Sequence, residues 1–262
     1  MLRADKISEE VKENDNCAEG FQNYDQTEPA ASSALHEDRN GQVSFYSNKS
    51  LCLFDDSQSI DGIYRIKTNL LKKLSSDHEA VMIAGGHNGA GCTTISINLG
   101  AVLAKSCAGK ILLVDSNFQK PDLTNAFKAD NRPGFHELIK AEAAIEDVIL
   151  TTDIPNLYFI GAGNSSGNRL DINTAQINDL LTQLRKQFFL TLFDSQPLEP
   201  RPEAVFIAGI IKNVLLVVES ESSRNETLES NRKLVENSGG KIIGAALNRR
   251  HLYIPPWLYN RL

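Results

Sequence analysis

The chain of 262 residues has no long apolar run. Its longest uninterrupted apolar stretches, such as residues 214–218, are far shorter than the roughly 20 residues that a helix needs to cross a bilayer. The N-terminal sequence MLRADKISEEVKEND also lacks the apolar core of a secretory signal. We therefore expect no transmembrane helix and a cytoplasmic location.

Cysteine is scarce as well. The four cysteines show neither a CxxC spacing nor a paired framework: Cys17, Cys52, Cys92 and Cys107. In a reducing compartment such residues are free thiols, so we expect no structural zinc site. No basic segment carries interleaved aromatic residues, and we expect no direct binding of nucleic acid.

Positive charge is scarce in the N-terminal part of the chain. Residues 1–60 hold five basic and twelve acidic side chains, a net charge of −7, and the remaining residues carry +1. This part offers little apolar surface to offset the entropy of ordering, so we expect residues 1–58 to be acidic and mostly disordered. Its apolar cluster, either a short docking element or a stretch lying on the domain, consists of Val43, Phe45, Leu51, Leu53 and Phe54.

From residue 60 onward, short apolar runs alternate with segments of helical periodicity. The expected strands are 80–85, 110–115, 157–161, 188–194, 213–218 and 241–247, and the expected helices are 60–75, 92–106, 172–186, 200–211 and 223–237. Continuous apolar strands alternating with helices predict an α/β domain over residues 59–250, with a mainly parallel sheet covered on both faces. Residues 251–262 are predicted to be an apolar strap or docking tail.

A glycine-rich turn follows the first strong strand. The sequence Gly86-x-x-x-x-Gly91-Cys92-Thr93 has the spacing of a phosphate-binding loop, except that Cys92 stands where the loop lysine is expected. Gly86, Gly89 and Gly91 permit the turns by which backbone N–H groups surround phosphate oxygens, and the following helix offers its positive end. The sequence therefore predicts the shape of a phosphate site without its charge.

Two carboxylates are expected at the same edge of the sheet. Asp115 and Asp194 each stand at the carboxyl end of a predicted strand, where ligands bind in parallel α/β sheets. Thr93 stands where a hydroxyl would hold Mg²⁺. The sequence therefore predicts a metal-nucleotide site formed by Thr93, Asp115 and Asp194.

Several segments in the same order resemble the bacterial tyrosine kinases of capsule and exopolysaccharide synthesis, within the MinD/ParA-like class of P-loop proteins. They are NGAGCTT (88–94), DSNFQKP (115–121), PGFHELI (133–139), DSQP (194–197) and GAALNRR (244–250). The resemblance implies a P-loop NTPase fold, with ATP or ADP and Mg²⁺ as cofactors. It also implies that Thr94 joins the phosphate loop, that Asn248 contacts adenine, and that Asp115 and Asp194 are catalytic if the protein is active.

The chain departs from the family pattern at charged positions. Cys92 replaces the loop lysine, and His87 replaces the additional signature lysine of MinD-type loops. Asn117 replaces the second acid of the DxD motif, and Gln119 replaces its arginine. Because phosphoryl transfer depends on charge and positioning, we expect little or no kinase activity and weak or absent ATP binding.

Two further family features are reduced. The acidic-x-x-Arg-x-x-Arg motif that supports oligomeric rings in the family reads Asp61-x-x-Tyr64-x-x-Lys67 here, and the C-terminal tyrosine cluster is reduced to Tyr253 and Tyr259. The resemblance leaves homo-oligomerisation open. The partner that it implies is the cytoplasmic segment of a membrane polysaccharide co-polymerase of the Wzz type, with the inner membrane contacted only through that partner.

Two functions from different classes follow. The first is a catalytically degenerate regulatory partner of the co-polymerase. The second is an active ATPase or tyrosine autokinase controlling chain length or export, in which Lys120, Arg201 or a neighbouring subunit supplies the missing charge. A ParA-like positioning ATPase fits less well, because PGFHELI and the C-terminal segment follow the polysaccharide branch.

Overall fold

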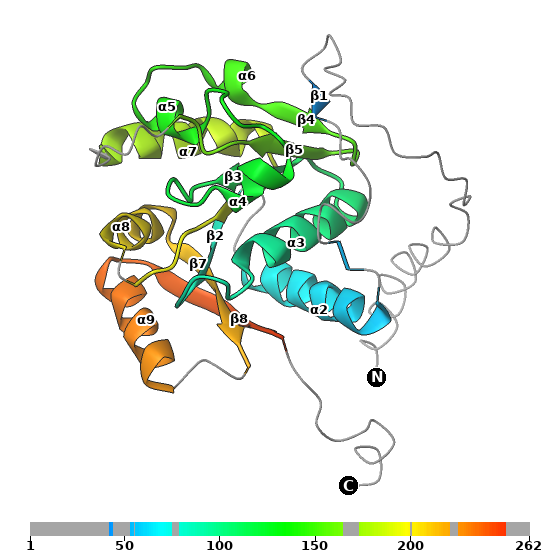
Figure 1. Cartoon of the computed structure of the whole chain (residues 1–262), viewed down its shortest axis with the longest axis vertical. Coiled ribbons are helices and arrows are strands. Elements are labelled where there is room, and N and C mark those ends of the chain that lie inside the picture. The colour runs from blue at the N-terminus through cyan, green and yellow to red at the C-terminus, as the bar shows by residue number, and fades with distance from the viewer. Residues whose placement is uncertain are drawn as a thin grey trace, which may run out of the picture. The chain divides into compact units, whose positions relative to one another are not determined.

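The computed structural model describes residues 42–43, 53–54, 56–74, 79–164, 173–199, 201–220 and 225–249 (Figure 1). The strands are β1 (Gln42–Val43), β2 (Glu79–Gly85), β3 (Ile111–Asp115), β4 (Leu150–Thr152), β5 (Leu157–Ile160), β6 (Leu190–Asp194), β7 (Asn213–Glu219) and β8 (Lys241–Asn248). The helices are α2 (Ser57–Lys73), α3 (Cys92–Ser106), α4 (Asp122–Ala126), α5 (Phe135–Ile139), α6 (Ile145–Val148), α7 (Thr174–Gln187), α8 (Pro202–Ile211) and α9 (Asn225–Asn237).

The strands form one sheet in the order β1-β4-β5-β3-β6-β2-β7-β8. Every neighbouring pair is parallel except β4 and β5. Strand β2 lies between β6 and β7, so the turn that follows β2 emerges in the middle of the carboxyl edge. The predicted fold class, a mainly parallel α/β sheet of the P-loop type, is confirmed.

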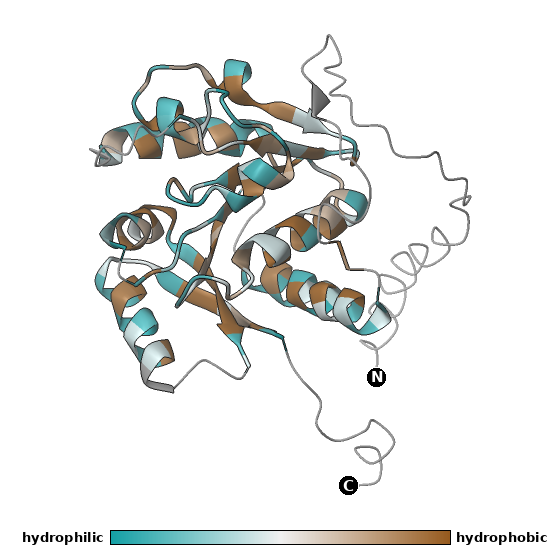
Figure 2. Ribbon diagram, viewed as in Figure 1, coloured by the Kyte–Doolittle hydropathy of each residue, from teal (hydrophilic) through white to brown (hydrophobic). Residues whose placement is uncertain are grey.

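Helices cover both faces of the sheet (Figure 1). Along β2, Val81 and Ile83 join the core that includes α2 and α3, whereas Ala80, Met82 and Ala84 join the core that includes α7 and α8. This alternation buries both faces of the strand and explains its continuous apolar sequence. Figure 2 shows both apolar and hydrophilic residues along α2, and the buried ones, Ile63 and Leu70, lie on one face of the helix.

Four described residues of the acidic N-terminal segment contact the domain. Gln42 and Val43 pair with β4, and the backbone N–H of Phe54 donates to Asn98 Oδ1 at 2.8 Å. Leu53 and Phe54 are half-buried against the core. These contacts fit the interpretation of the apolar cluster as a stretch lying on the domain, while the boundary at residue 58 stays a prediction.

The predicted long elements agree with the structure within a few residues, but short elements were missed. Helix α2 begins earlier than predicted because Asp56 caps it, its carboxylate accepting the N–H of Ser59 at 2.8 Å. Strand β4 and the short helices α4 and α6 had no prediction of their own, whereas a short helix around Phe135, His136 and Leu138 was predicted and is α5. No helix within the described ranges is long and apolar enough to cross a membrane. The predicted tail 251–262, with Tyr253 and Tyr259, lies outside those ranges.

Candidate nucleotide site

The glycine-rich turn connects β2 to α3. Gly89 and Gly91 adopt φ angles of +85° and +94°, a region that favours glycine. Gly91 is the N-cap of α3 and has no side chain, so it cannot cap the free N–H groups of the first helical turn. These groups and the positive end of the helix together suit an anion.

The end of β8 lies directly against this turn. Asn248 Nδ2 donates to the carbonyl oxygen of Ala90 at 2.9 Å, and a methyl group placed on Gly91 would collide with the same Nδ2 atom. The structure thus brings Asn248 to the glycine-rich turn, and its predicted contact with adenine stays a prediction. Thr94 lies in the first turn of α3, where its carbonyl oxygen accepts a hydrogen bond from Asn98 Nδ2 at 2.8 Å.

Thr93 and Asp194 meet beneath the loop. Thr93 Oγ1 donates to Asp194 Oδ2 at 2.7 Å, and Ser96 Oγ donates to Asp194 Oδ1 at 3.0 Å. Burial and, second, the nearby Asp115 raise the pKa of Asp194 to about 8. Ser96 was not predicted as a site residue, although its spacing of three residues from Thr93 places both hydroxyls on one face of a helix.

Asp115 faces Asp194 across the strands but has other partners. The two are register partners on β3 and β6, and both side chains are buried. Asp115 Oδ2 accepts the N–H and the hydroxyl of Thr124 at 2.8 and 2.7 Å, and its Oδ1 accepts the N–H of Asn117 at 3.0 Å. Burial raises the pKa of Asp115 to about 6. Asp115 therefore organises the turn into α4, and its catalytic or metal role stays a prediction.

Cys92 places a thiol where the family has its lysine. A methyl group on Gly85 would lie 3.0 Å from Cys92 Sγ, so the side chain turns back toward the end of β2. Burial raises the pKa of the thiol above its ordinary value, which keeps it neutral. The loop residues 86–93 contain no lysine or arginine.

His87, Glu219 and Arg249 lie together on the outer side of the loop. His87 Nδ1 lies 2.9 Å from the carbonyl oxygen of Asn88, and its Nε2 lies 3.4 Å from Glu219 Oε2. Arg249 Nη1 donates to Glu219 Oε1 at 2.7 Å. Sequence reasoning missed Glu219 and Arg249, because only the fold brings the ends of β7 and β8 to the loop.

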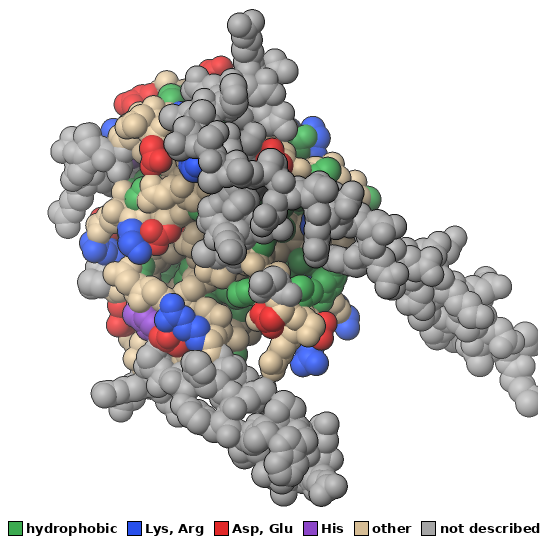
Figure 3. All heavy atoms as spheres, turned by 45° about the vertical axis from the view of Figure 1, so that its right-hand side comes forward, with side chains coloured by type: hydrophobic (Ala, Val, Ile, Leu, Met, Phe, Trp, Pro, Cys, Tyr) green, Lys and Arg blue, Asp and Glu red, His purple; other side chains and the backbone are tan. Residues whose placement is uncertain are grey.

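Lys120 and Arg201, the two side chains predicted to supply the missing charge, lie in different parts of the fold. Lys120 Nζ lies 2.9 Å from Asp122 Oδ2, and its side chain is exposed. Arg201 precedes the first residue of α8. On the face drawn in Figure 3, basic and acidic side chains of the described residues are interspersed.

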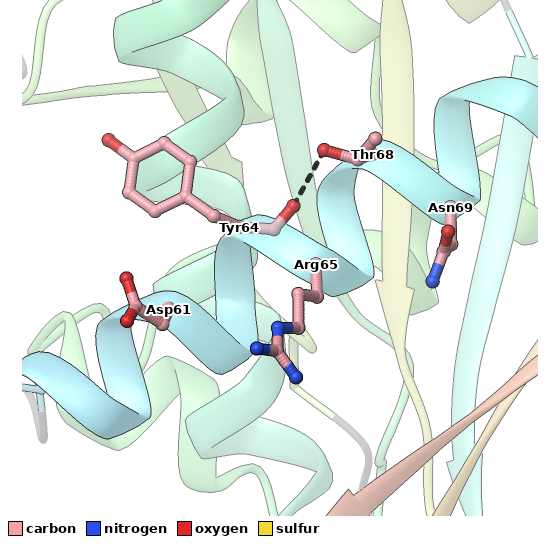
Figure 4. A pocket seen from close by; sticks show the side chains of 5 residues that line it. All are labelled: Asp61, Tyr64, Arg65, Thr68 and Asn69. Atoms are coloured by element: carbon pink, nitrogen blue, oxygen red, sulfur yellow. Dashed lines mark hydrogen bonds between the residues drawn. The ribbon is translucent and has the colours of Figure 1, made fainter. Parts of the chain in front are cut away.

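A surface pocket of about 450 Å³ lies along α2 (Figure 4). It is lined by Asp61, Tyr64, Arg65, Thr68 and Asn69. Asp61 and Tyr64 are two positions of the segment that matches the family's ring motif. The structure thus places them on an accessible helix, and homo-oligomerisation stays a proposal.

Comparison with known proteins bears on this site. No family model matches the chain. The tyrosine-protein kinase ptk of Acinetobacter johnsonii is 27% identical over 195 residues, which are 74% of this chain and 26% of that protein. The tyrosine-protein kinase CpsD of Streptococcus agalactiae is 24% identical over 186 residues, which are 70% of this chain and 79% of that protein. The curated homologues of this chain are bacterial tyrosine kinases.

Solved structures agree at the level of the fold. The kinase domain of the Escherichia coli tyrosine kinase ETK superposes with a TM-score of 0.68 at 19% identity, covering 85% of this chain and 88% of the other. MinD from Pyrococcus horikoshii, complexed with Mg-ADP, superposes with a TM-score of 0.57 at 21% identity, covering 70% and 76%. The chain thus shares the fold of bacterial tyrosine kinase domains and MinD ATPases, and it spans about a quarter of the ptk relative.

The site contains side chains that can hold Mg²⁺, but the loop has no lysine or arginine to offset the charge of nucleotide phosphates. A hydroxyl and a carboxylate are already paired at Thr93 and Asp194, and Mg²⁺ is commonly held by one or two carboxylates together with phosphate and water oxygens. When bound, Mg²⁺ would neutralise charge on the phosphates. The backbone of the loop can bind phosphate oxygens, but its side chains bring no cation.

Proposed function

We propose that the protein is a catalytically degenerate relative of the bacterial tyrosine kinases that acts as a regulatory partner in capsule or exopolysaccharide synthesis. The observation that carries this proposal is Cys92, a neutral and partly buried thiol at the lysine position. A loop lysine offsets phosphate charge in phosphoryl transfer, and a thiol cannot do so. ATP or ADP then serves as a weak structural ligand or does not bind.

The partner in this proposal is the cytoplasmic segment of a membrane polysaccharide co-polymerase. Support comes from the homologues, which include the capsule protein CpsD, and from a domain that keeps its sheet, its helices and its strand-end acids. The protein would then work in the cytoplasm and reach the inner membrane through this partner. The pocket along α2 is the candidate surface for contact between copies.

A binding measurement tests the degenerate function. Titration calorimetry of the natural protein with Mg-ATP should give weak or undetectable heat, and Cys92→Lys should bind more tightly. Incubation with labelled ATP should give no phosphotyrosine on the natural protein. Sub-micromolar binding of ATP by the natural protein would overturn the degenerate function.

An active tyrosine autokinase or ATPase is the second candidate. The preassembled pair of Thr93 and Asp194 favours it, because these residues have little other reason to be placed together at the loop. Polymer yield in a complemented deletion strain separates the two functions. Complete loss with stably expressed Asp194→Ala favours chemistry, whereas a larger loss on truncation before Tyr253 favours docking.

A further inference from the structure

Asn231 is a buried polar residue whose side chain lacks hydrogen-bond partners. It lies on α9, its exposed fraction is 0%, and neither Nδ2 nor Oδ1 has a partner among the described residues. An unpaired buried amide lowers stability, so its presence calls for an explanation. Its neighbours on α9 are ordinary surface residues: Ser230 bonds to Glu199, and Arg232 pairs with Glu229 and Glu236.

The unpaired amide faces the first glycine of the phosphate loop. A methyl group on Gly86 would collide with Asn231 Nδ2 and would lie 3.3 Å from Thr227 Cγ2. Helix α9 therefore packs directly against the backbone at Gly86. The carbonyl oxygen of Gly85 accepts the N–H of Leu198 at 3.0 Å, which leaves the peptide group between Gly86 and His87 as the one that can turn toward Asn231.

A second buried amide has an unpaired oxygen atom. Gln196 is 4% exposed, and its Oε1 has no partner in the described part of the chain. Its segment is tied to the end of β2, because Ser195 N donates to Ile83 O at 3.1 Å and Leu198 N donates to Gly85 O at 3.0 Å. Gln196 thus has a buried, unpaired acceptor on a segment that is hydrogen-bonded through its backbone to the end of β2.

We propose that Asn231 is a positioning residue for the phosphate loop, one that stabilises the loop conformation adopted with a phosphate-bearing ligand. In the ligand-free loop its carboxamide is unpaired. When the loop closes on phosphate oxygens, the peptide group between Gly86 and His87 rotates, which glycine permits, and pairs with Asn231. This inference rests on one part of the proposed function, namely that the loop keeps the shape of a phosphate site.

This role predicts effects of opposite sign in the two states. Asn231→Leu keeps the shape of the side chain and removes both unpaired atoms, so the ligand-free protein should melt at a higher temperature. The same change removes a hydrogen bond made only in the bound state, so affinity for ATP should fall about tenfold. A purely structural asparagine, including one bonded to an internal water, would instead lower the melting temperature and leave the affinity of the folded protein unchanged.

The experiment uses the full chain carrying Cys92→Lys, in which phosphate charge is restored. Melting temperature without ligand and Mg-ATP affinity by calorimetry are measured for this protein and for the same protein with Asn231→Leu. Asn237→Leu is the matched control, since Asn237 is an exposed asparagine at the end of the same helix. Asn231→Ala replaces Asn231→Leu if the leucine variant does not fold, with the same fall in affinity expected.

A higher melting temperature with tenfold weaker ATP binding supports the role of Asn231. Unchanged affinity, or a lower melting temperature with Asn231→Leu, overturns it while leaving nucleotide binding intact. Failure of the Cys92→Lys protein itself to bind ATP overturns the retained phosphate site, and the role of Asn231 with it. A further check combines two variants. Gly86→Ala should weaken ATP binding, and its added methyl group should also hinder folding by colliding with Asn231. Adding Asn231→Ala, which removes the colliding amide, should relieve this effect of Gly86→Ala on folding.

Discussion

The two ends of the phosphate loop differ in what they retain. At its helical end, Thr93 and Ser96 hold the carboxylate of Asp194 with two short hydrogen bonds. At the positions of the two lysines, Cys92 is neutral, and His87 bonds to a backbone oxygen and to Glu219. The half of the site around Asp194 is fixed by hydrogen bonds, whereas the half at the two lysine positions contains no lysine. The shape and hydrogen bonding of such a loop are therefore present here without a lysine.

Restoring charge to the half without a lysine should have the largest effect on ATP affinity. Cys92→Lys adds a charge-assisted contact to phosphate, for which about 1.5–3 kcal/mol is typical, so ATP affinity should rise roughly 10- to 150-fold. Calorimetry with Mg-ATP measures the change. Cys107→Lys, at the other end of α3, is the control that adds the same charge away from the loop. An equal gain in ATP affinity with Cys107→Lys would show that the gain does not depend on the loop position.

The shape of the loop should be the next most sensitive feature. Gly91→Ala combines a φ of +94° with a collision against Asn248, and we expect a loss of about 1–3 kcal/mol in the free energy of unfolding. Gly62→Ala is the matched change within α2, where no atom lies within 4 Å of the added methyl group. That variant should gain about 0.5–1 kcal/mol, because alanine favours the helix. Urea unfolding of both proteins measures the difference.

Asp194, in the half of the site that is hydrogen-bonded in place, should make the stability of the protein depend on pH. The pKa of Asp194 is about 8 in the folded protein against 3.8 as its ordinary value, so the folded state holds a proton that the unfolded state releases. Stability should therefore fall as pH rises from about 4 to 8, with a slope of up to about 1.4 kcal/mol per pH unit from this group. Urea unfolding at a series of pH values measures the slope. Asp194→Asn, which stays neutral, should flatten it, and an unchanged slope would assign the effect to other groups.

Removing the Ser96 hydroxyl, which donates a hydrogen bond to Asp194, should have the smallest effect on the free energy of unfolding. Ser96→Ala removes one hydrogen bond and should cost about 1 kcal/mol in the free energy of unfolding. Thr182→Ala is the control, because the Thr182 hydroxyl donates to the carbonyl of Asn178 on an exposed helix face. A loss at Ser96 no greater than at Thr182 would mean that Asp194 does not depend on this contact.

Sequence reasoning reached the long elements and the outline of the site, and it missed what depends on neighbours distant in the chain. The apolar runs of β2, β3 and β6 and the glycine spacing of the loop are local signals, and each lies where it was predicted. Strand β4 has only three residues and pairs antiparallel to β5, so neither its length nor its pattern distinguishes it from a loop. Glu219 and Asn231 come from β7 and α9 and carry no motif, and the GAALNRR motif that contains Arg249 does not indicate its ion pair with Glu219.

The sequence by itself determined the α/β class, the phosphate-loop turn and the absence of a lysine from that loop, because hydrophobic periodicity, glycine spacing and residue identity are properties of short segments. Only the tertiary structure decided the environment of each carboxylate. Asp115 and Asp194 are both strand-end acids in sequence, yet one is bonded to Asn117 and Thr124 and the other to Thr93 and Ser96. Hydrogen-bond partners and burial arise from packing between elements, and they set which acid is available to a ligand and how readily it ionises.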